Sequence, residues 1–151
     1  MSVSTLPAEG SFADRLAAGA HDAIALVGRI LMGWIFLSSG FGKLMNVTGF
    51  AAGLAKRGVP APSLMGWLGA IVEFGGGLLI ILGVKLRYIA ILMILFVIVA
   101  TLISHRYWDY PAEQLAAQHM NFWKNITIIG GLLFMFLAGA GRYSVDGLRK
   151  Q

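Results

Sequence analysis

The chain has 151 residues, of which 58% are hydrophobic and only 13% are charged, and its mean hydropathy is +0.76. A soluble domain carries nearer a quarter charged residues, so this composition indicates a protein embedded in a lipid bilayer. The net charge of +5 suits the surface of an anionic membrane. The basic residues are dispersed between apolar runs and do not cluster on a polar face, which argues against nucleic acid as a partner.

The sequence contains no cysteine. This excludes disulfides, Cys-ligated zinc, iron–sulfur clusters and a CxxC thiol relay within the chain. If the protein does redox work, its electrons must travel through a bound cofactor, a quinone or a partner. No metal site is predicted, because His21, His105 and His119 do not share a ligand spacing.

Four hydrophobic runs organise the chain, at 24–45, 64–84, 88–104 and 125–141. Each has at least 17 residues, the short end of what a membrane-spanning helix needs. In lipid every backbone polar group must be satisfied locally, which makes helix the expected structure for all four. The predicted fold is therefore all-α: a polytopic membrane protein with an antiparallel four-helix transmembrane bundle.

The connections between these runs differ in kind. Segment 46–63 contains helix-breaking glycine and prolines, although 50–56 is expected to form a short amphipathic turn at the interface. Segment 85–87 is so short that the second and third helices must form a tight hairpin. Segment 105–124 is rich in aromatic residues typical of a membrane interface, and 112–119 within it predicts a short surface helix.

Residues 1–23 are polar and mixed in charge, so we expect no cleavable signal peptide and an uncleaved first helix. The predicted organisation is a polar cytoplasmic N-terminal segment at 1–23, a transmembrane domain at 24–146 and a tail at 147–151. Lys and Arg are more numerous on the side that holds both termini, which places the termini in the cytoplasm. The basic residues on that side are Arg15, Lys85, Arg87, Arg142, Arg149 and Lys150.

Glu73 lies near the middle of an otherwise uncharged apolar run. A lone carboxylate at that depth costs about 2.5–3.5 kcal/mol on insertion scales, so it needs a partner, a proton or a function. We expect Arg29 of the first run to reach it as a bidentate ion pair, with Lys43 as the second choice. The pair would either handle protons or fix the register of the helices, and the sequence leaves both roles open.

A second group of polar residues falls at the opposite, outer end of the predicted bundle. Its cationic and titratable members come from three different helices, so we expect them to line one cavity suited to an anion or to the carbonyl oxygens of a quinone. Asp109 and Glu113 are the nearby carboxylates that would offset their repulsion. The alternative is that Lys43 and Lys124 extend into the headgroups. The predicted binding residues are Lys43, His105, Trp108, Trp123, Lys124 and Asn125.

These segments resemble the DoxX family of membrane proteins. "RILMGWIFLSSGFGKL" at 29–44 is similar to the R…G…F…G…KL signature of that family's first helix, and "EFGGGLLIILG" at 73–83 to its second. "HRYWD" at 105–109 and "FWKNITIIGGLLFMFLAGAGRYSVD" at 122–146 resemble its closing segment. The resemblance covers nearly the whole chain after residue 28.

The resemblance implies a four-helix protein of the bacterial inner membrane. One relative in the family is the membrane subunit of a thiosulfate:quinone oxidoreductase. By analogy, the chain is expected to pass electrons from a small donor or a soluble or membrane partner protein to quinone, with quinone as its cofactor. The alternative is a non-enzymatic membrane module: an assembly partner of a complex, or a carrier for a small anionic or aromatic compound. A homo-oligomer is compatible with either function.

Overall fold

The computed structural model describes residues 11–149, and these are helical with no strand. Four of the helices are long and apolar enough to cross a membrane, which confirms the predicted all-α class and its four spans. The predicted N-terminal segment and tail lie partly outside the described residues. The elements are α1 Phe12–Met45, α2 Val47–Lys56, α3 Pro62–Leu82, α4 Leu86–Ser104, the short 3-10 turn η1 Tyr107–Asp109, α5 Ala112–Ala138 and α6 Val145–Leu148.

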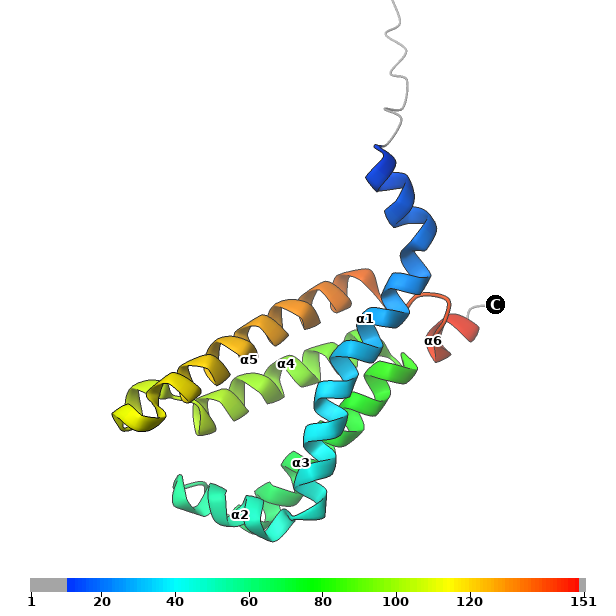
Figure 1. Ribbon diagram of the computed structural model, residues 1–151. Coiled ribbons are helices and arrows are strands. Elements are labelled where there is room, and N and C mark those ends of the chain that lie inside the picture. Colours follow the sequence, from blue (N-terminus) through cyan, green and yellow to red (C-terminus); the bar gives the residue numbers. More distant parts are fainter. Residues whose placement is uncertain (1–10, 150–151) are drawn as a thin grey trace, which may run out of the picture.

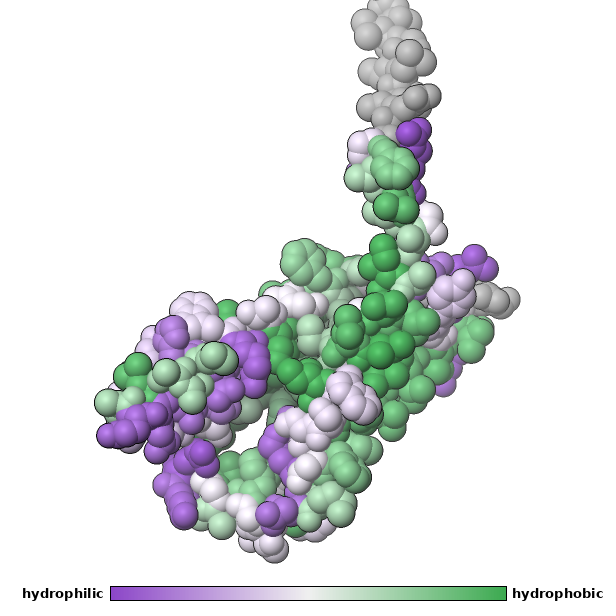
Figure 2. Space-filling model, in the orientation of Figure 1, coloured by the Kyte–Doolittle hydropathy of each residue, from purple (hydrophilic) through white to green (hydrophobic). Residues whose placement is uncertain are grey.

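The spanning helices are arranged as two antiparallel pairs, α1 with α3 and α4 with α5 (Figure 1). The pairs are joined beside the C-terminal segment that carries α6, and they diverge toward their other ends. Helix α2 lies across the open end of the first pair, where it packs against α3. Hydrophobic side chains cover the middle of the α1/α3 pair, and hydrophilic ones gather at the far tips of the molecule (Figure 2).

Glycines allow α1 and α3 to approach closely. A Cβ atom added at Gly40 would lie 2.4 Å from the backbone nitrogen of Phe74. One added at Gly77 would lie 2.6 Å from the backbone nitrogen of Leu37. Small residues are a common means of packing helices in membranes, where no hydrophobic force drives helices together. The α1/α3 pair is therefore held by close backbone packing.

The apolar core lies toward the end where the two pairs join. Ile80, Leu86, Met93 and Leu132 are fully buried there and come from α3, α4 and α5. The turn between α3 and α4 is tight, as predicted: Gly83 ends α3 at a φ of +66°, where a residue without Cβ is favoured. This junction fixes one end of both pairs and leaves the other end free to diverge.

Two helices extend beyond the predicted runs. Helix α1 begins at Phe12, well before the apolar run, because Ser11 and Asp14 form a reciprocal capping box at its start. Helix α5 begins at Ala112, so the predicted surface helix at 112–119 is the first part of the fourth span. The helical turn expected at 50–56 is present within the longer helix α2, and its place at the membrane interface stays a prediction. The cytoplasmic location of both termini stays a prediction.

Candidate functional site

Arg29 is almost completely buried, with 1% of its surface exposed. Its Nη1 donates to the carbonyl of Ile81 at 3.2 Å, and its Nη2 donates to the carbonyl of Tyr143. The predicted ion pair between Arg29 and Glu73 is therefore wrong. Ile81 lies about 12 Å further along α3 than Glu73, at about 1.5 Å per residue. There the last carbonyls of the helix lack intrahelical donors and attract the guanidinium.

The surroundings of Arg29 tie the C-terminal segment to the α3–α4 turn. A Cβ atom at Gly83 would lie 2.0 Å from Arg29 Nη1, so the guanidinium fits only because residue 83 has no side chain. Beside it, Asp146 accepts hydrogen bonds from the backbone nitrogens of Lys85 and Leu86, at 2.8 and 3.1 Å, and so caps the start of α4. Arg29 thus joins three parts of the chain, which indicates a structural role.

Glu73 forms its ion pair with Lys43, the partner predicted as second choice. The Glu73 side chain is 8% exposed and that of Lys43 is 28% exposed, so the pair is largely removed from the surface. Lys43 also donates to Ser39 Oγ at 2.9 Å, and its ammonium lies 5.4 Å from the centre of the Phe50 ring. Helices α1, α2 and α3 each contribute to holding this lysine.

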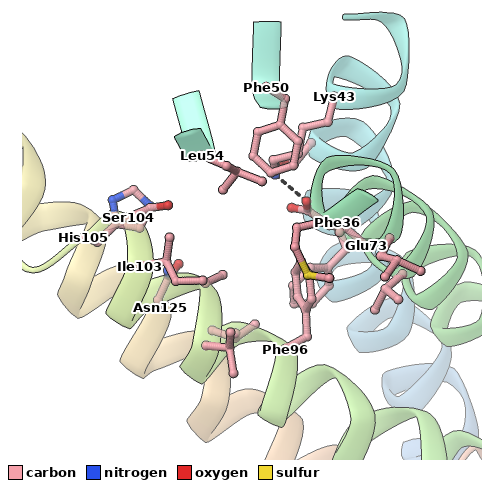
Figure 3. Close-up of a pocket in the computed structure, with 18 of the residues that line it drawn as sticks. Phe36, Lys43, Phe50, Leu54, Glu73, Phe96, Ile103, Ser104, His105 and Asn125 are labelled. Carbon is pink, nitrogen blue, oxygen red and sulfur yellow. Dashed lines mark hydrogen bonds and ion pairs between the residues drawn. The ribbon is translucent and has the colours of Figure 1, made fainter. Parts of the chain in front are cut away.

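The ion pair faces a cavity of about 360 Å³ between the two helix pairs (Figure 3). Most of its wall is apolar and includes Phe36, Leu54 and Phe96. Lys43 and Glu73 lie on the wall built by α1 and α3. The opposite wall, built by α4 and α5, carries the polar residues Ser104, His105, Lys124 and Asn125.

Hydrogen bonds fix the polar side chains of this second wall. Asn125 Nδ2 donates to Thr101 Oγ1 at 2.8 Å, and that hydroxyl donates to the carbonyl of Val97 at 2.6 Å. The chain of bonds links α5 to α4. It leaves the carbonyl oxygen of the Asn125 amide as a further polar atom on a residue that lines the cavity.

His105 and Lys124 are held by neighbours on α5. His105 Nδ1 shares a hydrogen bond of 2.8 Å with Gln118 Oε1, and Lys124 donates to Asn121 Oδ1 at 3.1 Å. Both residues line the cavity. The structure therefore brings together Lys43, His105, Lys124 and Asn125, four of the six residues predicted to bind a ligand.

Trp108 and Trp123 do not line the cavity, and their predicted place in it is wrong. Both are about half exposed, and they join Tyr107 and Phe122 in edge-to-face contacts with ring centres 5.0–5.7 Å apart. Trp123 precedes Lys124 on one helix, so its side chain is turned about 100° away from that of the lysine. This aromatic cluster lies at the start of α5.

The carboxylate that pairs with a cationic residue of the cavity is neither of the two that were predicted, Asp109 and Glu113. Asp109 pairs with Arg106 at 2.9 Å on the surface, and Glu113 is not among the lining residues. Glu73 is the carboxylate that neutralises Lys43, because the Lys43 side chain extends along α1 toward it. Ser104 and Phe50 also line the cavity and were not predicted. For Ser104 the available signal was a hydroxyl beside His105 at the end of an apolar run.

The cavity combines an apolar body with a few polar atoms. Lys43 is a hydrogen-bond donor, Asn125 can donate or accept, and Glu73 can accept or release a proton. Within residues 11–149 no group of three or more His, Cys, Asp or Glu side chains is placed to hold a metal ion. The arrangement suits a small, mostly apolar molecule with a polar head group.

Comparisons with known proteins agree with this architecture. The sequence profile of the DoxX family matches residues 24–106. Inner membrane protein YphA of Escherichia coli K12 is 33% identical over 127 residues, which is 84% of this chain and 91% of the relative. Inner membrane protein YqjF of the same organism is 35% identical over 128 residues, or 85% and 93%. An uncharacterised membrane protein of Mycobacterium tuberculosis is 29% identical, covering 78% and 76%. No solved structure matches significantly.

Proposed function

We propose, from the premise that this chain belongs to the DoxX family of inner-membrane proteins, that its cavity binds a quinone. In this proposal the chain is the membrane subunit of a redox system that passes electrons from a small donor or a partner protein to that quinone. One observation carries the proposal: an apolar cavity between spanning helices has the Lys43–Glu73 pair on one wall and Asn125 on the other.

The chemistry of a quinone head group matches these walls. Its ring is apolar and its two carbonyl oxygens accept hydrogen bonds on opposite edges. Lys43 and Asn125 lie on opposite walls, and both carry N–H donors; the bond from Asn125 Nδ2 to Thr101 uses only one of its two hydrogens. The volume of about 360 Å³ is within the range of sites that bury a small ligand.

Reduction of a quinone to a quinol takes up two electrons and two protons. Glu73 is the titratable group in the cavity best placed to pass protons, because it is buried and its carboxylate is held by Lys43. His105 on the other wall is a second titratable group. The electrons would come from the separate donor, and the role of this chain would be to bind, orient and protonate the quinone.

The test is direct titration of the purified protein with a short-chain ubiquinone, followed by calorimetry. Lys43→Met removes the donor but keeps the length and apolar character of the side chain. We expect it to weaken quinone affinity about tenfold, as expected for loss of a charged hydrogen bond. Lys56→Met, at the end of α2 and outside the cavity, is the matched control. Equal affinities in both variants and the wild type would contradict the proposal.

The non-enzymatic alternative also has an observation in its favour. The two helix pairs are joined at one end, and a carrier needs elements that can move relative to one another (Figure 1). A carrier for a small aromatic anion would bind benzoate through Lys43 and would not support turnover of quinone. Binding of benzoate, without competition from quinone, would favour this second function.

A further inference from the structure

A second hollow, of about 670 Å³, lies at the opposite end of the molecule from the cavity. It is lined by His21 and Asp22 of α1, the start of α4, the end of α5 and the C-terminal segment at 139–149. The four basic residues among its lining are Lys85, Arg87, Arg142 and Arg149. We infer that this hollow binds the phosphate group of an anionic phospholipid, a role separate from that of the quinone cavity.

The charge of the hollow is unbalanced. Its four Lys and Arg side chains face only two carboxylates, Asp22 and Asp146. Asp22 accepts from the backbone nitrogen of Arg142 and lies 3.5 Å from His21 Nδ1, and Asp146 accepts from the backbone nitrogens of Lys85 and Leu86. Among residues 11–149, the side chains of Lys85, Arg142 and Arg149 form no ion pair. Several cations in one concave site repel one another unless an anion is bound. A phosphate group supplies that anion and accepts several hydrogen bonds.

One of the cations is already fixed in position. Arg87 donates through Nε to the carbonyl of Phe136 at 3.0 Å and through Nη2 to that of Leu137 at 3.4 Å. The guanidinium is therefore held at the rim of the hollow, beside the end of α5. Such a fixed group loses little conformational entropy when it contacts an anion.

The position of the hollow favours a lipid over free phosphate. It lies where α3 ends, α4 begins and α5 ends, so it is at the surface of the bilayer if these helices span it. Tyr88, which lines it, and Leu137 beside it are 74% and 70% exposed and would contact acyl chains. Basic pockets between spanning helices at this level suit anionic headgroups. A free phosphate has no apolar part that could contact the apolar rim.

The experiment compares two variants that each lose two positive charges, one at the hollow and one at the end of α2. Arg142→Gln/Arg149→Gln alters the hollow, and Lys56→Gln/Arg57→Gln is the matched control. Delipidated protein is mixed with phosphatidylglycerol or phosphatidylcholine, and bound lipid is counted by native mass spectrometry. We expect wild type and control to prefer phosphatidylglycerol, and the Arg142/Arg149 variant to bind it about tenfold more weakly. Arg142→Lys/Arg149→Lys should keep most of the binding.

Three results would overturn the inference. Equal binding of the two lipids by the wild type would show that the hollow does not select charge. An equal loss in both double variants would show attraction by net charge alone. Displacement of phosphatidylglycerol by equimolar inorganic phosphate would make free phosphate the ligand and remove the lipid from the site. Thermal unfolding of each variant is measured in parallel, and the single variants Arg142→Gln and Arg149→Gln serve as the binding test if the double glutamine variant is unfolded.

Discussion

The two ends of this molecule handle buried charge in opposite ways. At the closed end, Arg29 donates to backbone carbonyls of α3 and the C-terminal segment, and the helix pairs meet around it. At the open end, Lys43 and Glu73 neutralise each other beside a cavity, and the pairs diverge. A buried charge such as Arg29, which joins chain segments, is surrounded by protein atoms. A charge pair on a cavity wall can exchange one of its partners for a ligand. The comparison therefore assigns a structural role to Arg29 and a binding role to the cavity beside Lys43 and Glu73.

The largest effect on stability is expected from the closed end. Arg29→Met leaves the carbonyls of Ile81 and Tyr143 without their donor. Hydrogen bonds from a charged donor contribute about 1.5–3 kcal/mol each, so the free energy of unfolding should fall by about 3 kcal/mol. The measurement is unfolding in mixed detergent micelles. Arg29→Lys keeps the charge but loses the planar guanidinium. Its free energy of unfolding should lie between those of the wild type and Arg29→Met. Unchanged stability in Arg29→Met would remove the structural role.

The close packing of α1 against α3 gives the next largest effect. Gly40→Ala places a Cβ 2.4 Å from the backbone nitrogen of Phe74, so the helices must separate. Overpacking of this kind costs about 1–3 kcal/mol. The control is Gly42→Ala on the same helix, which meets no atom within 4 Å. Its stability should stay the same or rise by up to about 1 kcal/mol through better helix propensity. Equal effects of the two substitutions would contradict the packing.

At the open end, substitutions of the ion pair should affect the free energy of unfolding and the quinone affinity differently. Glu73→Gln leaves Lys43 without its carboxylate and should lower the free energy of unfolding by about 1–2 kcal/mol, less than for a fully buried pair because Lys43 is partly exposed. The double variant Lys43→Met/Glu73→Gln removes the unpaired charge and should regain most of that loss. Quinone affinity should stay weak in the double variant. A double variant that binds quinone like the wild type would show that the pair is only structural.

The smallest effect concerns the cap that holds the C-terminal segment to α4. Asp146→Ala removes an acceptor for the backbone nitrogens of Lys85 and Leu86, and loss of such a cap costs about 1 kcal/mol. Asp109→Ala removes a carboxylate from an exposed ion pair with Arg106 and should have no measurable effect. Both are compared by thermal unfolding. Equal melting temperatures would mean that the C-terminal segment adds nothing to the closed end.

Much of the fold follows from the sequence, because hydrophobic runs in lipid must be helical. The four spans were predictable on that ground. The start of α1 at Phe12 was not predicted, because its signal is local: Ser11 followed three residues later by Asp14. The divergence of the helix pairs also lay beyond sequence patterns, since it depends on which helix faces touch.

How far along its helix each site residue lies was predictable. The direction in which its side chain points was not. Lys43, His105, Lys124 and Asn125 share one cavity because they lie toward the same end of the spanning helices. Position along a helix does not determine which way a side chain points. For this reason Trp123 was predicted to line the cavity but does not. The partner of Glu73 was predicted in the wrong order, because free carbonyls at the end of α3 compete for Arg29. Catalytic or proton-handling roles for Glu73 and Arg29 stay predictions, although the contacts of Arg29 favour structure.

Filling the cavity between the helix pairs shows whether this cavity is the ligand site. Ala100 lines the cavity, whereas Ala116 is exposed on α5 and does not. We expect Ala100→Phe to weaken short-chain ubiquinone binding about tenfold or more, because the ring takes up the space of the head group. Ala116→Phe should bind as the wild type does. Both variants must elute as folded protein. Equal quinone affinity in Ala100→Phe, Ala116→Phe and the wild type would place the ligand elsewhere and contradict the account.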